Sequence, residues 1–213
     1  MSGRRQVPSQ EEVAAEEISH RRVTRWPAIV ALLAITLAYT GVSEGLAFVP
    51  RVAIPAAVLV GILLIWLALM RGGYFLVRPI ALGLIAFITL TEAGSTLLLV
   101  SLLPRGSVAA DVLLRDGAII WGINVVTFAL WYWEIDGGGP VARRMEPYKG
   151  TDFLFPQEAR AAEGGSNSSS SSSRGKWSPE FIDYLFFLAF NHSTAFSPTD
   201  TAILSRRAKV LVK

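Results

Sequence analysis

Four long apolar runs alternate with short polar segments along this chain. The runs cover residues 26–48, 52–70, 79–103 and 117–133, and only Glu44 and Glu92 within them carry an ionisable side chain. At a rise of about 1.5 Å per residue, runs of this length are able to cross a hydrocarbon slab roughly 30 Å thick. The pattern therefore predicts an all-α fold, a polytopic membrane bundle with four transmembrane helices.

The remaining sequence divides around these runs. Residues 1–25 are a polar N-terminal segment, residues 26–134 are the four-helix transmembrane region, and residues 135–178 are a soluble linker rich in Gly and Ser. Residues 179–213 hold an aromatic short helix, a loop and a basic helix. We expect the serine tract within the linker to be its least ordered part, because such composition lacks the apolar side chains that a packed core needs.

Two helix starts are predicted near the C-terminus. Ser178 before Pro179, and Ser197 before Pro198, each place a capping residue in front of a proline at the first helical position. The first helix, over residues 179–191, is too short for a full span, so we expect it to be re-entrant or interfacial. The second helix is basic, and it is either interfacial or the start of a span that the sequence does not complete.

Composition supports a bilayer as the surroundings of this chain. Charged residues make up 17% of it and hydrophobic residues 52%, whereas soluble domains carry about 25% charged residues. The net charge is +3 and the pI is about 9.4, but the arginines flank the apolar runs, which indicates contact with anionic lipid headgroups. The lipid bilayer is therefore the expected partner, and no nucleic acid is expected.

Lysine and arginine are distributed unequally between the two sides of the predicted bundle. One side has Arg21, Arg22, Arg25, Arg71, Arg78, Arg143, Arg144 and Lys149 near the span ends, and the other has Arg51, Arg105 and Arg115. The side richer in these residues faces the cytoplasm in most membrane proteins. We therefore expect a multi-pass protein of the cell inner (plasma) membrane with a cytoplasmic N-terminus.

The sequence offers little material for catalysis or metal binding. Cysteine is absent, and His20 and His192 are the only histidines, so thiolate chemistry is excluded and a His-based metal centre has no basis. Asp183 and His192 flank the aromatic short helix, but no nucleophile motif accompanies them. We expect no enzyme activity, no cofactor and no metal.

Glu92 is the residue most costly to place in a membrane. A charged carboxylate near the bilayer centre costs several kcal/mol, so Glu92 should face the bundle interior and be paired or protonated. It is either a proton or cation site in a transport path, or a neutral acid hydrogen-bonded to a neighbouring helix, with Asn124 as one candidate partner. Glu44 is either part of a polar cluster with Asn124 and Glu92 that opens to the outside, or solvated at the bilayer surface.

Several short phrases occur together in this chain. They are GIN at residues 122–124, WYWEIDGGGP at 131–140, DFLFPQ at 152–157, YLF at 184–186, TAFSPTDT at 194–201 and SRRAK at 205–209. In this combination the chain resembles a family of uncharacterised bacterial multi-spanning membrane proteins, over roughly residues 26–213. The resemblance implies the multi-spanning fold and no established activity.

The C-terminal region is also distantly similar to the pore module of potassium channels, in which a short pore helix leads into a filter loop. The similarity implies a pore-like loop with Thr194, Phe196, Ser197 and Asp200 as its candidate residues. Both filter glycines are missing, and Pro198 opposes the backbone shape that a carbonyl-lined filter requires. Potassium-selective conduction is therefore not expected.

Two classes of function remain. The first is an integral membrane protein with a channel-like or transporter-like role for an unidentified small solute or ion. The second is a non-transporting membrane scaffold or partner-binding protein, in which Glu92 only holds helices together. Both are compatible with a homo-oligomer.

Overall fold

Four apolar helices and a smaller C-terminal unit make up the described part of the chain. The computed structural model describes residues 26–72, 74–106, 108–140, 151–157, 179–194 and 201–212. The helices are α2 (Trp26–Thr40), α3 (Ala53–Met70), α4 (Tyr74–Leu102) and α5 (Ala110–Ile135). By length and composition, α3, α4 and α5 are each long and apolar enough to cross a membrane, and α2 is a shorter apolar helix. Residues 1–25 lie outside the described part.

The first predicted span is shorter than its apolar run. The run extends over residues 26–48, but α2 ends at Thr40 and the chain then forms a turn. The amide N–H of Gly41 donates to the Ala38 carbonyl at 3.0 Å, which closes the last turn of the helix. The Tyr39 hydroxyl donates to the Val49 carbonyl at 3.1 Å and thereby folds the following loop back onto α2. We call residues 41–52 the 41–52 loop.

The third and fourth spans begin earlier than predicted. Helix α4 begins at Tyr74, so Pro79 lies inside it and not at its start. Helix α5 begins at Ala110, seven residues before the fourth predicted run at residue 117. Only the short 3₁₀ turn η1 (Leu103–Arg105) separates α4 from the chain that leads into α5, and Gly106, with φ of 58°, ends that turn. The second span matches its prediction within one residue.

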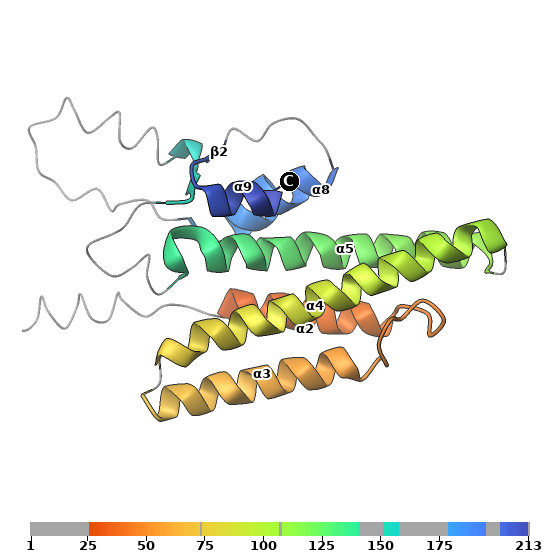
Figure 1. Ribbon diagram of the computed structural model, residues 1–213, viewed down its shortest axis with the longest axis horizontal. Helices are drawn as coiled ribbons and strands as arrows, with labels where there is room; N and C mark the ends of the chain where they lie inside the picture. The colour runs from red at the N-terminus through yellow and green to blue at the C-terminus, as the bar shows by residue number, and fades with distance from the viewer. Residues whose placement is uncertain are drawn as a thin grey trace, which may run out of the picture.

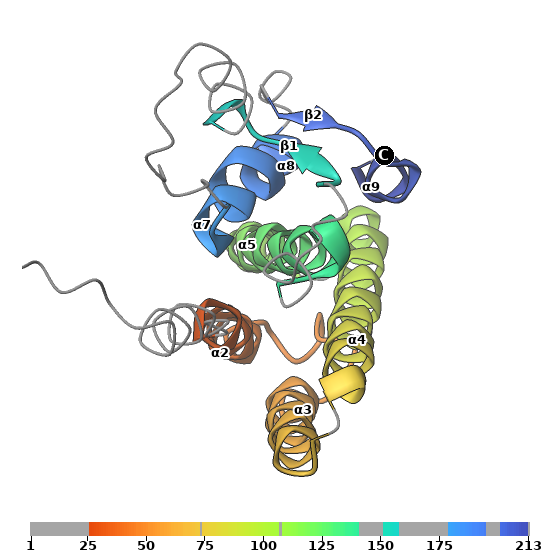
Figure 2. The same cartoon turned by 90° about the vertical axis from the view of Figure 1, so that its left-hand side faces the viewer.

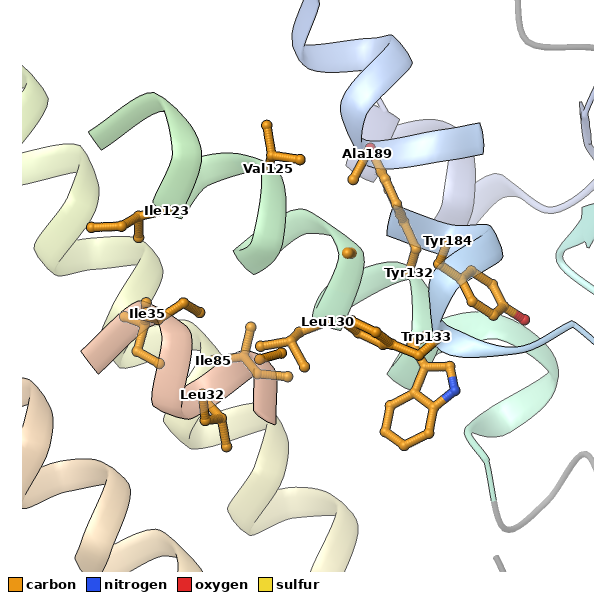
Figure 3. Packing of buried hydrophobic residues seen from close by; sticks show 14 of the residues in the cluster. Leu32, Ile35, Ile85, Ile123, Val125, Leu130, Tyr132, Trp133, Tyr184 and Ala189 are labelled. Carbon is orange, nitrogen blue, oxygen red and sulfur yellow. The ribbon is translucent and has the colours of Figure 1, made fainter. Parts of the chain in front are cut away.

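Helix α5 is the central helix of the structure. Helices α2 and α4 pack against it, α3 packs against α4 and α2, and the C-terminal helices cover a different side of α5 (Figures 1 and 2). The core between these layers is apolar and includes Ile35, Ile85, Ile123 and Leu130 (Figure 3). Helices α3 and α4 approach closely at Gly61, where an added Cβ would lie 2.9 Å from Leu84 Cδ2.

The C-terminal unit is built from two separate parts of the chain. Strand β1 (Phe153–Leu154) pairs antiparallel with β2 (Ala202–Ile203). Between them in sequence, α7 (Phe181–Asp183), the π-helix η5 (Tyr184–Phe190) and α8 (Asn191–Thr194) follow each other directly and form one continuous helical segment. We call residues 181–194 the aromatic helix. Helix α9 (Arg206–Val212) follows β2.

Several predictions for the C-terminal region need correction. Residues 136–140 and 151–157 belong to the predicted linker, yet Asp136, Phe153 and Phe155 are fully buried. The aromatic helix extends to Thr194 and not to residue 191. The predicted start of the last helix at Ser197 and Pro198 lies outside the described residues, as does the serine tract. The described helix begins at Arg206, and the Ser205 hydroxyl accepts a hydrogen bond from the Ala208 amide at 3.2 Å.

The outer faces of the long helices are rich in large apolar side chains. On α4, Leu90 and Leu97 are 70% and 71% exposed. Similar residues cover the outer face of α3, including Leu59 and Trp66. An apolar surface of this extent needs an apolar partner. The faces agree with helices that are long and apolar enough to span a membrane.

The contact between Gly94 of α4 and Phe48 of the 41–52 loop gives a first prediction. A Cβ at position 94 would lie 2.3 Å from Phe48 Cγ, so Gly94→Ala must displace the ring and the Phe48 amide, which donates to Ser95 Oγ at 3.2 Å. We expect a loss of about 1–2 kcal/mol in the free energy of unfolding, measured by thermal or denaturant unfolding in detergent. Gly83→Ala on the same helix is the control, because its Cβ would meet nothing within 4 Å. Equal stability of the two variants would contradict the prediction.

Candidate functional site

Glu92 lies at the contact between α4 and α5. Its side chain is only 6% exposed, and Asn124 and Thr127 of α5 lie beside its carboxyl group. Within the described part of the chain, Glu92 Oε1 and Thr127 Oγ1 are buried without a hydrogen-bond partner. The prediction that Glu92 faces the bundle interior and lies near Asn124 agrees with this geometry.

Asn124 links Glu92 to the C-terminal unit. Asn124 Oδ1 accepts a hydrogen bond from the Ser193 hydroxyl at 3.4 Å, and Trp121 Nε1 donates to the Ser193 carbonyl oxygen at 3.4 Å. Glu92, Asn124 and Ser193 therefore form a short polar line across α4, α5 and α8. The sequence did not identify Ser193, because only the fold brings it close to residue 124.

Glu44 does not belong to this polar line. Because α2 ends at Thr40, Glu44 lies in the 41–52 loop, where its side chain is 85% exposed and its Oε1 lies 3.7 Å from Arg51 Nη1. This exposure agrees with the alternative that Glu44 is solvated. The other alternative, a cluster of Glu44 with Asn124 and Glu92, is wrong for Glu44. A pair this exposed contributes little to stability.

Of the candidate pore-like loop, the structure describes only Thr194. Its hydroxyl donates to the Phe190 carbonyl at 2.8 Å, so it is hydrogen-bonded within its own helical segment. Phe196, Ser197 and Asp200 lie outside the described residues. The pore-like loop therefore stays a prediction.

Asp116, near the N-terminal end of α5, is a buried acid that the sequence did not predict. The Asp116 side chain is fully buried; its Oδ2 accepts from the Ser43 amide at 2.8 Å, and its Oδ1 accepts from Arg115 Nη2 at 2.8 Å. Arg115 Nη2 also donates to Ser43 Oγ at 2.8 Å. Asp116 therefore fastens the 41–52 loop to α5. In the sequence it stood in a charged segment, with no sign of its distant partner.

The second missed acid is Asp136, at the C-terminal end of α5. Its Oδ2 accepts from the Tyr184 hydroxyl at 2.5 Å, and its Oδ1 accepts from the amides of Asp152 at 2.6 Å and Phe153 at 3.2 Å. Asp152 in turn accepts from the Gly137 amide at 3.0 Å. This carboxylate joins α5, β1 and the aromatic helix. The signal was present in the WYWEIDGGGP phrase, but the glycines suggested a linker.

Of Asp116, Asp136 and Glu92, only Glu92 has a buried carboxyl oxygen without a hydrogen-bond partner. Asp116 and Asp136 accept several hydrogen bonds each and act as structural links. An oxygen atom of Glu92 that is buried without a partner is available to a proton or a small cation. Within the described residues no group of three or more His, Asp or Glu side chains is arranged to hold a metal ion, so a proton requires fewer additional ligands than a metal does.

Comparisons of this chain with protein-family models, with curated proteins and with solved structures give no match. The fold defines a mostly helical protein with three helices long and apolar enough to span a membrane.

Proposed function

We propose that this chain is a channel-like or transporter-like integral membrane protein that binds a proton or a small cation at Glu92. The observation that carries the proposal is the partnerless Oε1 of Glu92 in an apolar helix contact, next to Asn124 and Thr127. Leaving a buried polar atom unpaired costs about 1–3 kcal/mol. A bound proton or cation at this oxygen removes that cost, and release of the ligand restores it.

The proposal includes the topology of the chain in the membrane. Helix α2 with the 41–52 loop makes a fourth crossing, and the N-terminus lies in the cytoplasm of a cell bounded by an inner (plasma) membrane. The α3–α4 turn and the start of α9 lie at the same end of the molecule (Figure 1), and they contribute the exposed cations Arg71, Arg206 and Arg207. With Arg78 near the start of α4, this end carries four described arginines, whereas the other end carries three, Arg51, Arg105 and Arg115. The larger number supports the cytoplasmic assignment of the first end.

Flux through proteoliposomes tests the role of Glu92. A proton gradient across vesicles that contain the protein should dissipate faster than across empty vesicles, and Glu92→Gln should reduce the rate to that of empty vesicles, because the amide does not ionise. Glu44→Gln is the matched control, since it neutralises an exposed carboxyl group outside the polar line. The same pair of variants should be tested with sodium and potassium gradients.

A second function is favoured by the bond between Asn124 and Ser193. Because this bond uses Asn124 Oδ1 to hold the C-terminal unit, the polar line also suits a non-transporting scaffold or partner-binding protein, either alone or as a homo-oligomer. Flux equal to that of empty vesicles for every ion, with a binding partner that is lost in Asn124→Leu, would support this alternative and contradict transport.

A further inference from the structure

The aromatic helix lies along α5 in the opposite direction. Its first residue, Phe181, packs edge-on against Trp133 near the end of α5, with ring centroids 5.8 Å apart. Near its other end, Phe190 packs against Trp121 at 5.9 Å, and Ser193 bonds to Asn124. The two helices thus share an antiparallel contact from the C-terminal end of α5 to its middle.

This register sets the depth that the aromatic helix reaches. From Trp133 to Asn124 the chain of α5 advances nine residues, which at about 1.5 Å per residue is about 14 Å. That is about half of a hydrocarbon layer roughly 30 Å thick. Strand β2 then pairs with β1, and β1 packs on Tyr132 through Phe153, with ring centroids 5.4 Å apart. The start of the aromatic helix and strand β2 therefore lie at the same end of α5 (Figure 1).

Two of the last four carbonyls of the aromatic helix accept hydrogen bonds from side chains. The Asn191 carbonyl accepts from Thr194 Oγ1 at 3.4 Å, and the Ser193 carbonyl accepts from Trp121 Nε1 of α5 at 3.4 Å. The last carbonyls of a helix ordinarily bind water. Side chains take the place of water at these two carbonyls, which suits a helix that ends inside a low-dielectric medium.

The exposed face of the aromatic helix is apolar. Ile182, Phe186, Phe187 and Phe190 are exposed, and no charged residue lies between Tyr184 and Phe190. The acidic residues Glu180 and Asp183 are confined to the shallow end, where the Glu180 amide donates to Asp183 Oδ2 at 2.8 Å. The apolar face continues through the Phe190–Trp121 contact into the exposed surface of α5, where Trp121 is 43% exposed.

From these observations we infer that the aromatic helix is a re-entrant half-helix. It enters the bilayer at the side where α5 ends, stops near mid-depth beside Asn124, and binds lipid acyl chains with the face formed by Ile182, Phe186, Phe187 and Phe190. This inference needs no transport activity, because it depends only on the register with α5 and on the apolar face. It decides between the re-entrant and interfacial alternatives that the sequence left open.

Spin labels at single cysteines test the inference directly. The chain contains no cysteine, so Ile182→Cys, Phe186→Cys and Phe190→Cys each carry one thiol without any background substitution. The protein is reconstituted in liposomes of phosphatidylcholine and phosphatidylglycerol. For each spin label, the accessibility to oxygen is divided by the accessibility to a water-soluble nickel chelate, and this ratio rises with the depth of the label in the bilayer. We expect this ratio to increase from Ile182 through Phe186 to Phe190. Leu90→Cys on the outer face of α4 sets the value for a deep position, and Gln157→Cys sets the aqueous value.

Two results would overturn the inference. Equal ratios at the three positions would show a helix lying flat at the interface, and values like that of Gln157 at all three would show a face in water or against a protein. If Phe190→Cys disturbs the contact with Trp121 and the protein does not fold, Phe187→Cys replaces it as the deep position, since Phe187 is half exposed and lies less than one turn away. A flux assay without signal does not affect this outcome.

Discussion

Asp136→Ala is expected to lower the free energy of unfolding by about 3–5 kcal/mol, because it removes a buried charged acceptor and leaves its donors unpaired. The affected donors are the Tyr184 hydroxyl and the amides of Asp152 and Phe153. Phe153 and Tyr184 are themselves fully buried, so water cannot replace the lost acceptor without opening the core. The loss should concentrate in the C-terminal unit, which Asp136 joins to α5.

Limited proteolysis and unfolding in detergent measure this effect. Asp136→Ala should expose sites near β1 and the aromatic helix while α3 and α4 stay protected. Asp111→Ala is the matched control, because Asp111 is an exposed acid on the same helix. Asp136→Asn keeps one acceptor oxygen and should lose less. A loss below about 1 kcal/mol for Asp136→Ala, no more than for an ordinary surface change, would contradict the role given to this carboxylate.

The parts of the fold that hydropathy predicted correctly are those whose ends are set locally. Helix α3 lies between Pro50 and Gly72, which has φ of 71°, and its observed bounds match the prediction within one residue. The end of α2 was misplaced because the residues that follow Thr40 remain apolar. What ends the helix there is a loop held by Asp116 and Ser95, which lie more than 40 residues away in sequence.

The same distinction explains the candidate site. Glu92 and Asn124 were expected to be near each other because both occupy apolar runs, where a polar side chain must face a neighbouring helix. Ser193 and Asp116 carried no such local signal, and the glycines after Asp136 indicated a linker instead. Asp136 in particular precedes three glycines, and its burial depends on Tyr184, 48 residues later. Long-range partners of this kind are set by packing, which the pattern of single positions does not contain.

Glu92→Leu is expected to raise the free energy of unfolding by about 1–3 kcal/mol, because an apolar side chain of similar size replaces a buried carboxyl group with a partnerless oxygen. A binding site with an unpaired buried oxygen lowers the stability of the empty protein. Replacing the binding residue commonly raises the free energy of unfolding and abolishes the activity. A structural acid gives the opposite sign, since the buried polar side chains beside it, Asn124 and Thr127, would then face an apolar group. The sign of the change therefore separates the two functions proposed for this chain.

The free energy of unfolding is measured in mixed micelles for the wild type, Glu92→Leu and Glu92→Gln. The binding site predicts that Glu92→Leu is more stable than the wild type and that both variants have no flux. A scaffold predicts that Glu92→Leu is less stable and that Glu92→Gln, which retains the hydrogen-bonding shape, is close to the wild type. Thr91→Val controls for a change of polarity at the adjacent position, because the Thr91 hydroxyl donates only to the Phe87 carbonyl of its own helix at 3.0 Å. A destabilised Glu92→Leu would thus remove the main support for a proton or cation site and leave Glu92 as a link between α4 and α5.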